Sequence, residues 1–105
     1  MRKIRFSPEA ANDLEQTKVY ISEELGSKPS AIKTVSDILN RIRTLADFPQ
    51  IGAPLSSIVK IDTDYRFLVC GNYIAFYRVE GESVFIIRVL YGKRNFIEIL
   101  FGKFE

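Results

Sequence analysis

The N-terminal part of the chain has hydrophobic positions spaced first as in a strand and then as in a helix. Residues 3–6 alternate charged and apolar side chains, which is typical of a short strand. Ser7 suits the N-cap of a helix, Pro8 its first position, and Gly26 its C-terminal stop. The pattern therefore predicts a helix over residues 8–25. Its expected buried stripe consists of Ala10, Leu14, Thr17, Ile21 and Leu25.

A second helix is expected from about Pro29 to Phe48-Pro49, because the residue before a proline disfavours helical geometry. Its apolar stripe is the clearest helical pattern in the chain and consists of Ile32, Val35, Ile38, Leu39, Ile42, Leu45 and Ala46. The short connection around Gly26 predicts an antiparallel helical hairpin. Its apolar stripe must be covered by another part of the fold.

The C-terminal half changes to the spacing of strands. We expect three strands joined by tight polar turns, over residues 65–70, 73–79 and 83–90. The last strand is apolar apart from Arg88, which favours a central position in the sheet. Residues 50–64 are predicted as a loop with a short extended piece, and Asn95 as the cap of a short helix or turn over residues 96–101.

The order of these elements predicts an α+β fold in which an N-terminal strand and a helical hairpin pack on a mainly antiparallel sheet. It reads β-α-α-β-β-β with a short C-terminal element. The length of 105 residues, 47% of them hydrophobic, suits one domain over residues 1–105 and is too short for two.

Composition excludes several classes of site. Cys70 is the single cysteine and the chain has no histidine, so neither a disulfide nor a zinc site of these ligands is expected, and no metal or cofactor is predicted. The absence of histidine also removes the side chain that most readily exchanges protons near neutral pH. A formal charge of +2 does not by itself indicate a nucleic-acid binder. No signal peptide or membrane span is visible, so we expect a soluble, cytoplasmic protein without membrane contact.

The basic loop after the last predicted strand is the strongest candidate for recognition. Lys93 and Arg94 lie where a rigid sheet can hold cations for an anionic or hydrogen-bonding partner, although they also suit a solvated turn. Arg88 is expected either to contact a target or to pair internally with a carboxylate. The carboxylates considered for that pair are Asp62, Asp64 and Glu98.

Several segments together resemble one family. They are Leu45 to Gly52 at the end of the helical hairpin, the strand start Tyr65-Arg66, the strand Tyr73 to Val79, and the segment Arg88 to Asn95. Taken in this order and spacing, they resemble the RelE/ParE superfamily of bacterial toxins from type II toxin–antitoxin systems, and are more similar to the ParE branch. Tyr91 stands where that branch usually has a histidine, and Asn95 where an aspartate is usual.

The resemblance implies a toxin of a plasmid-stabilisation system that is neutralised by a cognate antitoxin and contacts DNA only through the antitoxin complex. The ParE branch is associated with DNA gyrase, and the RelE branch with cleavage of mRNA on the ribosome. In a RelE-like nuclease, Arg66 and Arg94 would occupy catalytic cationic positions. However, Leu68, Ile74 and Leu100 are apolar at positions where that branch carries polar groups.

Losing that many charge-stabilising groups would remove several kcal/mol of transition-state stabilisation, at roughly 1.4 kcal/mol per tenfold in rate. We therefore predict gyrase inhibition by binding, with an endoribonuclease or a degenerate toxin that only binds its antitoxin as the alternatives. The predicted target-binding residues are Arg66, Arg88, Tyr91, Lys93 and Arg94. The predicted antitoxin-binding residues are Phe96, Ile97, Leu100 and Phe101, beside the sheet edges and a groove along the hairpin.

Overall fold

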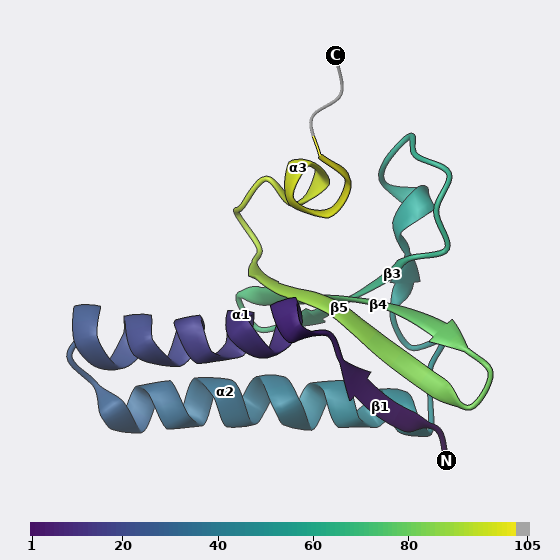
Figure 1. The fold of residues 1–105 in the computed structure, drawn as a ribbon. Helices are drawn as coiled ribbons and strands as arrows, with labels where there is room; N and C mark the ends of the chain where they lie inside the picture. Colours follow the sequence, from purple (N-terminus) through teal and green to yellow (C-terminus); the bar gives the residue numbers. More distant parts are fainter. Residues whose placement is uncertain (103–105) are drawn as a thin grey trace.

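The computed structural model describes residues 1–102 as a helical hairpin packed on a five-stranded sheet (Figure 1). The last three residues of the predicted domain, 103–105, lie outside the described part. The main elements are β1 (Lys3–Phe6), α1 (Pro8–Val19), α2 (Lys28–Arg43), β2 (Ala53–Pro54), β3 (Arg66–Cys70), β4 (Tyr73–Glu80), β5 (Ser83–Tyr91) and α3 (Phe96–Phe101). The predicted α+β class and element order are confirmed, with β2 as the short extended piece of the loop.

Both helices of the hairpin begin with a serine cap, as their sequences dictate. The Ser7 hydroxyl accepts a hydrogen bond from the Ala10 N–H at 2.9 Å, and the Ser27 hydroxyl accepts one from the Ser30 N–H at 3.2 Å. Proline follows each cap within the first two helical positions. The caps therefore fix where both helices start.

The end of the first helix differs from the prediction. Residues Tyr20–Glu24 form a π-helical turn after α1, and Gly26 then reverses the chain with a φ of +71°. Leu25 and Ile32 were both expected to be buried, but each is 63% exposed. Leu25 is exposed because the loop end of the hairpin extends beyond the sheet (Figure 1), and Ile32 because it lies beside Lys18 and Val35, off the buried face of α2 that carries Ala31 and Ile38.

The sheet has the order β1-β5-β4-β3-β2. β5 lies between β1, to which it is parallel, and β4, to which it is antiparallel, so the central position predicted for the last strand is confirmed. β1 pairs only up to Phe6, opposite Ile86, and the chain then turns into α1. The remaining edge of β5, from Ile87 to Tyr91, is therefore left to α1.

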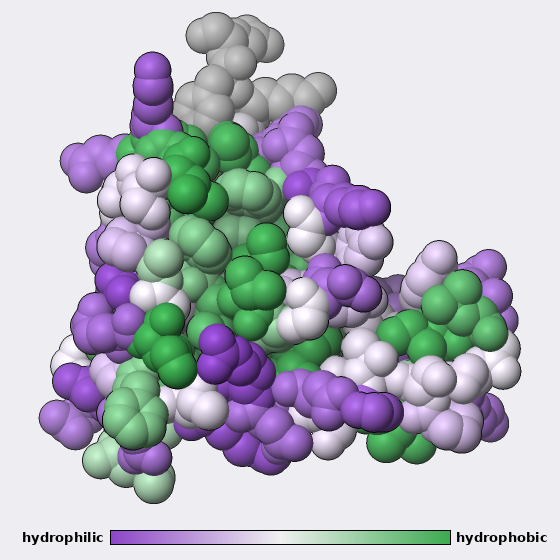
Figure 2. Space-filling view, turned by 180° about the vertical axis from the view of Figure 1, so that it is seen from behind, coloured by the Kyte–Doolittle hydropathy of each residue, from purple (hydrophilic) through white to green (hydrophobic). Residues whose placement is uncertain are grey.

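Two hydrophobic clusters lie in the fold. The larger is shared by the hairpin and the sheet, and includes Ile38, Ile42, Leu68, Ile86 and Val89, all nearly inaccessible to solvent. The smaller centres on Leu55, Phe76 and Leu90 and is closed by the loop before β3 and by α3. Figure 2 shows hydrophobic side chains gathered in the middle of the rear face of the molecule.

The C-terminal helix packs on the smaller cluster through two aromatic contacts. The rings of Phe76 and Phe96 stack with centroids 5.2 Å apart, and those of Tyr65 and Phe101 with centroids 5.6 Å apart. No residue of α3 is fully buried. The segment predicted to bind antitoxin thus also covers part of the sheet, and its role toward a partner stays a prediction.

Candidate functional site

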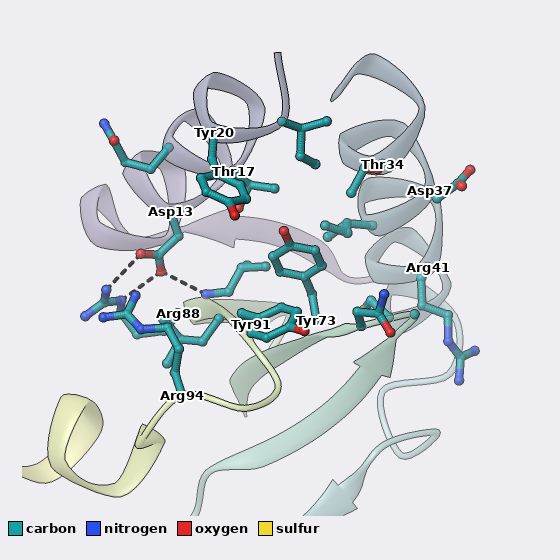
Figure 3. A pocket seen from close by; sticks show the side chains of 18 of the residues that line it. Asp13, Thr17, Tyr20, Thr34, Asp37, Arg41, Tyr73, Arg88, Tyr91 and Arg94 are labelled. Atoms are coloured by element: carbon teal, nitrogen blue, oxygen red, sulfur yellow. Dashed lines mark hydrogen bonds and ion pairs between the residues drawn. The ribbon is translucent and has the colours of Figure 1, made fainter. Parts of the chain in front are cut away.

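An open groove of about 1270 Å³ lies between the hairpin and the ends of the central strands (Figure 3). One wall comes from α1, the π-helical turn and α2, and the other from the β3–β4 turn and the last residues of β5. Arg88, Tyr91 and Arg94 line it, whereas the groove residues do not include Arg66 or Lys93. The structure thus brings three of the five predicted target-binding residues together.

A partly buried ion pair crosses from α1 to β5 at one end of the groove. The Arg88 guanidinium donates through Nε and Nη2 to the two carboxylate oxygens of Asp13, each at 2.8 Å. One of these oxygens also accepts the Val89 N–H at 2.9 Å, and the Asp13 side chain is only 7% exposed. The hydrogen bonds to Asp13 raise the pKa of Arg88 above its ordinary value. Arg88 is therefore a fixed cation.

The partner of Arg88 corrects the sequence-based expectation, which placed it among Asp62, Asp64 and Glu98. Because β1 ends opposite Ile86, the next free N–H groups of β5 face α1, and Asp13 occupies that edge. Asp64 instead lies 3.7 Å from Arg78, and Glu98 accepts a hydrogen bond from the Asn95 side chain. The internal pairing itself was one of the two predicted outcomes.

Three tyrosines from three different elements line the groove (Figure 3). Tyr73 and Tyr91 are cross-strand partners whose rings meet edge to face, with centroids 5.7 Å apart. Tyr20 projects from the π-helical turn and is 53% exposed. Beneath them, burial raises the pKa of the Cys70 thiol from 9.0 to about 11, so the thiol is neutral at physiological pH.

Arg94 is the cation that reaches the groove from the loop after β5 (Figure 3). Within residues 1–102, its side chain makes no hydrogen bond or ion pair, and its backbone N–H bonds to the Tyr91 carbonyl. Lys93 beside it is exposed and does not line the groove. The end of β5 thus carries one fixed cation and two available ones.

Arg66 lies apart from this groove and uses its donors internally. Its Nη2 donates to the carbonyls of Gly52 at 2.7 Å and Gln50 at 3.3 Å, and its Nε donates to the Tyr77 hydroxyl at 3.3 Å. That hydroxyl in turn donates to the Pro49 carbonyl at 2.8 Å. Arg66 and Tyr77 together anchor the loop after α2 to the sheet.

The three apolar residues that stand where a RelE-like nuclease carries polar groups all pack in the hydrophobic clusters. Leu68 is 2% exposed in the larger cluster, while Ile74 and Leu100 belong to the smaller one. None can donate or accept a hydrogen bond, so none can stabilise charge. In addition, no group of three or more metal-ligating side chains is placed to hold an ion within residues 1–102.

Sequence reasoning missed Asp13, Tyr20 and Arg41 as groove residues. The burial of Asp13 could have been predicted from the sequence, because Asp13 lies three residues after Ala10 and four before Thr17, on the buried face of α1. A charged residue on such a face needs a partner. The position of Tyr20 at the groove could not have been predicted, since the direction of its side chain depends on the π-helical turn.

A helical hairpin on a sheet of this order defines the fold of the RelE/ParE superfamily of small toxins. Residues 4–96 match the model of the family described as the ParE toxin of the type II toxin–antitoxin system parDE, and the chain belongs to this family. It is thus the toxin component of a toxin–antitoxin pair, which confirms the predicted superfamily, branch and kind of partner. No match was found among curated proteins.

Two solved structures illustrate the likeness. A chain of the chromosomal ParDE toxin–antitoxin system of P. aeruginosa is 26% identical, with a TM-score of 0.72 over 87% of this chain and 96% of that one. A chain of the E. coli DinJ–YafQ complex is 17% identical, with a TM-score of 0.52 over 97% and 100% of the two chains, and shares the fold. No helix within residues 1–102 has the length and apolar character needed to cross a bilayer.

Proposed function

We propose that this toxin inhibits DNA gyrase by binding it in the cytoplasm, without catalysing a reaction itself. The binding surface is the end of β5 and the following loop, with Arg88, Tyr91, Lys93 and Arg94. The observation that carries the proposal is the Arg94 side chain, which has no side-chain partner within residues 1–102 and lies in the loop that follows β5, the strand that carries the fixed cation Arg88. Available guanidinium groups bind carboxylates and phosphates through two parallel hydrogen bonds.

Arg66 has a different part in this proposal. Three of its hydrogen bonds go to the loop at residues 50–52 and to Tyr77. Its contribution is therefore to hold the loop in place, and it supports the binding surface only through the stability of the fold. The predicted contact between Arg66 and the target is accordingly left out of the proposed surface.

RNA cleavage is disfavoured by the surroundings of the residues it would need. A nuclease site gathers cations and a proton donor or acceptor around one phosphate. Here Arg66 anchors a loop while Arg94 lies at the groove, and Leu68, Ile74 and Leu100 supply only hydrocarbon. The endoribonuclease and the degenerate toxin are therefore outcomes that the test must separate.

The test compares two purified systems. We expect the toxin to inhibit supercoiling of relaxed plasmid by gyrase and to leave cell-free translation of a reporter mRNA unaffected. Inhibition of translation with mRNA cleavage, and no effect on gyrase, would establish the endoribonuclease in place of the proposal. Inactivity in both systems, with antitoxin binding retained, would identify a degenerate toxin.

A further inference from the structure

The pair with Asp13 uses only one edge of the Arg88 guanidinium. Nε and Nη2 donate along that edge, each at 2.8 Å from a carboxylate oxygen. Nη1 and the outer N–H of Nη2 form a second edge in the same plane, which can hold another oxyanion. Within residues 1–102, Nη1 donates to no acceptor and is open to solvent, and the Arg88 side chain is 24% exposed. The second edge is therefore available to a ligand.

Asp13 also fixes the direction of this second edge. Its carboxylate accepts the Val89 N–H at 2.9 Å in addition to the two bonds from Arg88, and its side chain is only 7% exposed. Neither side chain can rotate without breaking these bonds. The guanidinium plane is thus set before a ligand arrives, so little side-chain entropy is lost on binding.

Arg94 brings a second guanidinium to the same end of the groove. Figure 3 shows the side chains of Arg88 and Arg94 projecting toward the Asp13 end, one from β5 and the other from the loop that follows it. The Arg94 side chain makes no hydrogen bond or ion pair within residues 1–102. Two guanidinium groups, one fixed and one adjustable, can therefore act on the same anion.

The surrounding charges favour one carboxylate over a nucleic acid as that anion. Hydrogen bonding to Asp13 raises the pKa of Arg88 most, and the charge of Glu9, one turn earlier on α1, raises it further. Two carboxylates thus offset the charge of Arg88, and Arg94 supplies a further positive charge. A nucleic-acid strand carries a phosphate at every nucleotide and needs several unpaired cations, whereas one carboxylate needs only the Arg88 edge and Arg94.

We propose that Arg88 and Arg94 form a clamp for one carboxylate of the target, an aspartate or glutamate side chain on gyrase. The carboxylate accepts two parallel hydrogen bonds from the second edge of Arg88 and pairs with Arg94. Asp13 is the positioning residue, because it holds Arg88 without touching the target. The identity of the target rests on the proposed function, whereas the carboxylate site rests on the geometry of the two arginines.

Acetate is the probe that tests the clamp without gyrase. It is titrated into the purified toxin at constant ionic strength while the Nε–H signals of the arginine side chains are followed by NMR. We expect the signals of Arg88 and Arg94 to shift with one dissociation constant, and that of Arg66, whose donors are bonded internally, to stay unchanged. An unmoved Arg88 signal, or an equal shift at Arg66, would overturn the clamp.

Dimethyl phosphate, titrated in the same way, represents a nucleic-acid ligand. It carries the same single charge as acetate, but its oxygens are less basic and accept weaker hydrogen bonds. We therefore expect it to bind more weakly than acetate. Tighter binding of dimethyl phosphate would assign the site to a phosphodiester and overturn the carboxylate.

A matched pair of exposed carboxylates tests the local charge. Glu9→Gln removes the negative charge that acts on Arg88, and Glu15→Gln makes the same change in the middle of the helix. We expect acetate to bind about two- to threefold more tightly to Glu9→Gln and with unchanged affinity to Glu15→Gln. Equal changes in the two variants would reflect overall charge and contradict a local site. Circular dichroism confirms that each variant is folded.

Surface plasmon resonance with DNA-free gyrase connects the clamp to the proposed function. Arg88→Lys keeps the positive charge but lacks the second edge, so the folded variant should bind gyrase roughly tenfold more weakly, and Glu9→Gln about two- to threefold more tightly. Wild-type affinity in Arg88→Lys, or gyrase binding only in the presence of DNA, would overturn the clamp. If the acetate results hold and no form of the toxin binds gyrase, the proposed function fails and the carboxylate site stands.

Discussion

Two regions of the molecule use arginine in opposite ways. In the loop anchor, Arg66 and Tyr77 hold residues 49–52 against the sheet. At the groove end, Arg94 lies in the loop that follows β5. Arg66 gives its donors to two backbone carbonyls and a tyrosine hydroxyl, whereas Arg94 gives none to residues 1–102. Arg88 lies between these cases, because its partly buried pair with Asp13 fixes it while leaving it at the groove. Under the proposed function, an arginine's availability, more than its presence, separates a residue that binds the target from one that supports the fold.

The burial of the two regions explains why they differ. Tyr77 is fully buried and its hydroxyl needs a partner, so the loop carbonyls and Arg66 form one closed network. At the groove, by contrast, the side chains of Tyr91 and Arg94 are exposed to solvent. Substitutions in the first region should therefore change stability, and those at the groove rim should change binding.

The largest expected effect comes from the ion pair that supports the groove end. Asp13→Ala leaves Arg88 without its carboxylate and the Val89 N–H without its acceptor, and should lower the free energy of unfolding by about 3–5 kcal/mol. Urea denaturation measures the change. Glu15→Ala, an exposed carboxylate in the middle of the same helix, is the control and should change it by less than about 0.5 kcal/mol. A loss below about 1 kcal/mol for Asp13→Ala would contradict the structural importance of the pair.

The next effect tests how tightly the loop anchor is packed. A Cβ at Gly52 would lie 2.4 Å from the Phe67 carbonyl oxygen and 2.6 Å from the Tyr77 hydroxyl. Gly52→Ala should therefore cost about 2–3 kcal/mol in thermal or urea unfolding. Gly92→Ala is the matched control, because its Cβ meets nothing closer than the Asn72 carbonyl oxygen at 3.3 Å. Equal costs for the two variants would show that the anchor region relaxes easily.

The two arginines are compared directly by replacing each with alanine and measuring the free energy of unfolding. Arg66→Ala should lower the free energy of unfolding by about 2 kcal/mol, because it removes hydrogen bonds to a charged donor. Arg94→Ala should change it by less than about 0.5 kcal/mol. Denaturation of both variants under one set of conditions measures the difference. Similar values for the two would remove the distinction between a supporting and an available arginine.

The last effect concerns the groove floor, and it is absent at neutral pH and develops only at alkaline pH. Because the pKa of Cys70 is raised from 9.0 to about 11 in the folded state, the folded protein holds its thiol proton where the unfolded chain has lost it. Stability from this group is complete below pH 9 and falls by about 1.4 kcal/mol per pH unit between pH 9 and 11. Denaturation of wild type and Cys70→Ala across this window should show the steeper decline in wild type. Parallel declines would contradict a buried thiol.

Local signals in the sequence were sufficient for most of the fold. The Ser7 cap, Gly26, Pro29 and the apolar spacing predicted both helices and the three C-terminal strands, because each depends on neighbouring residues. The π-helical turn and the exposure of Leu25 and Ile32 were not predictable in this way. They depend on how far the hairpin extends past the sheet and on which face of each helix the sheet covers, and spacing along one helix specifies neither.

The candidate site was predictable only in part, for a related reason. Arg88, Tyr91 and Arg94 lie within one short segment, so the sequence indicated their proximity. Asp13 lies 75 residues before Arg88, and their contact depends on where β1 stops pairing with β5. Likewise, Arg66 bonds mostly to backbone carbonyls, and because every residue has one, the sequence does not indicate which of them it contacts.

The most direct measurement of the central claim is gyrase inhibition by a toxin that lacks both available cations. Lys93→Ala combined with Arg94→Ala should fold with wild-type stability and should lose inhibition of plasmid supercoiling by purified gyrase, whereas Arg66→Lys should retain it. Full inhibition by the folded double variant would contradict a target surface at the end of β5.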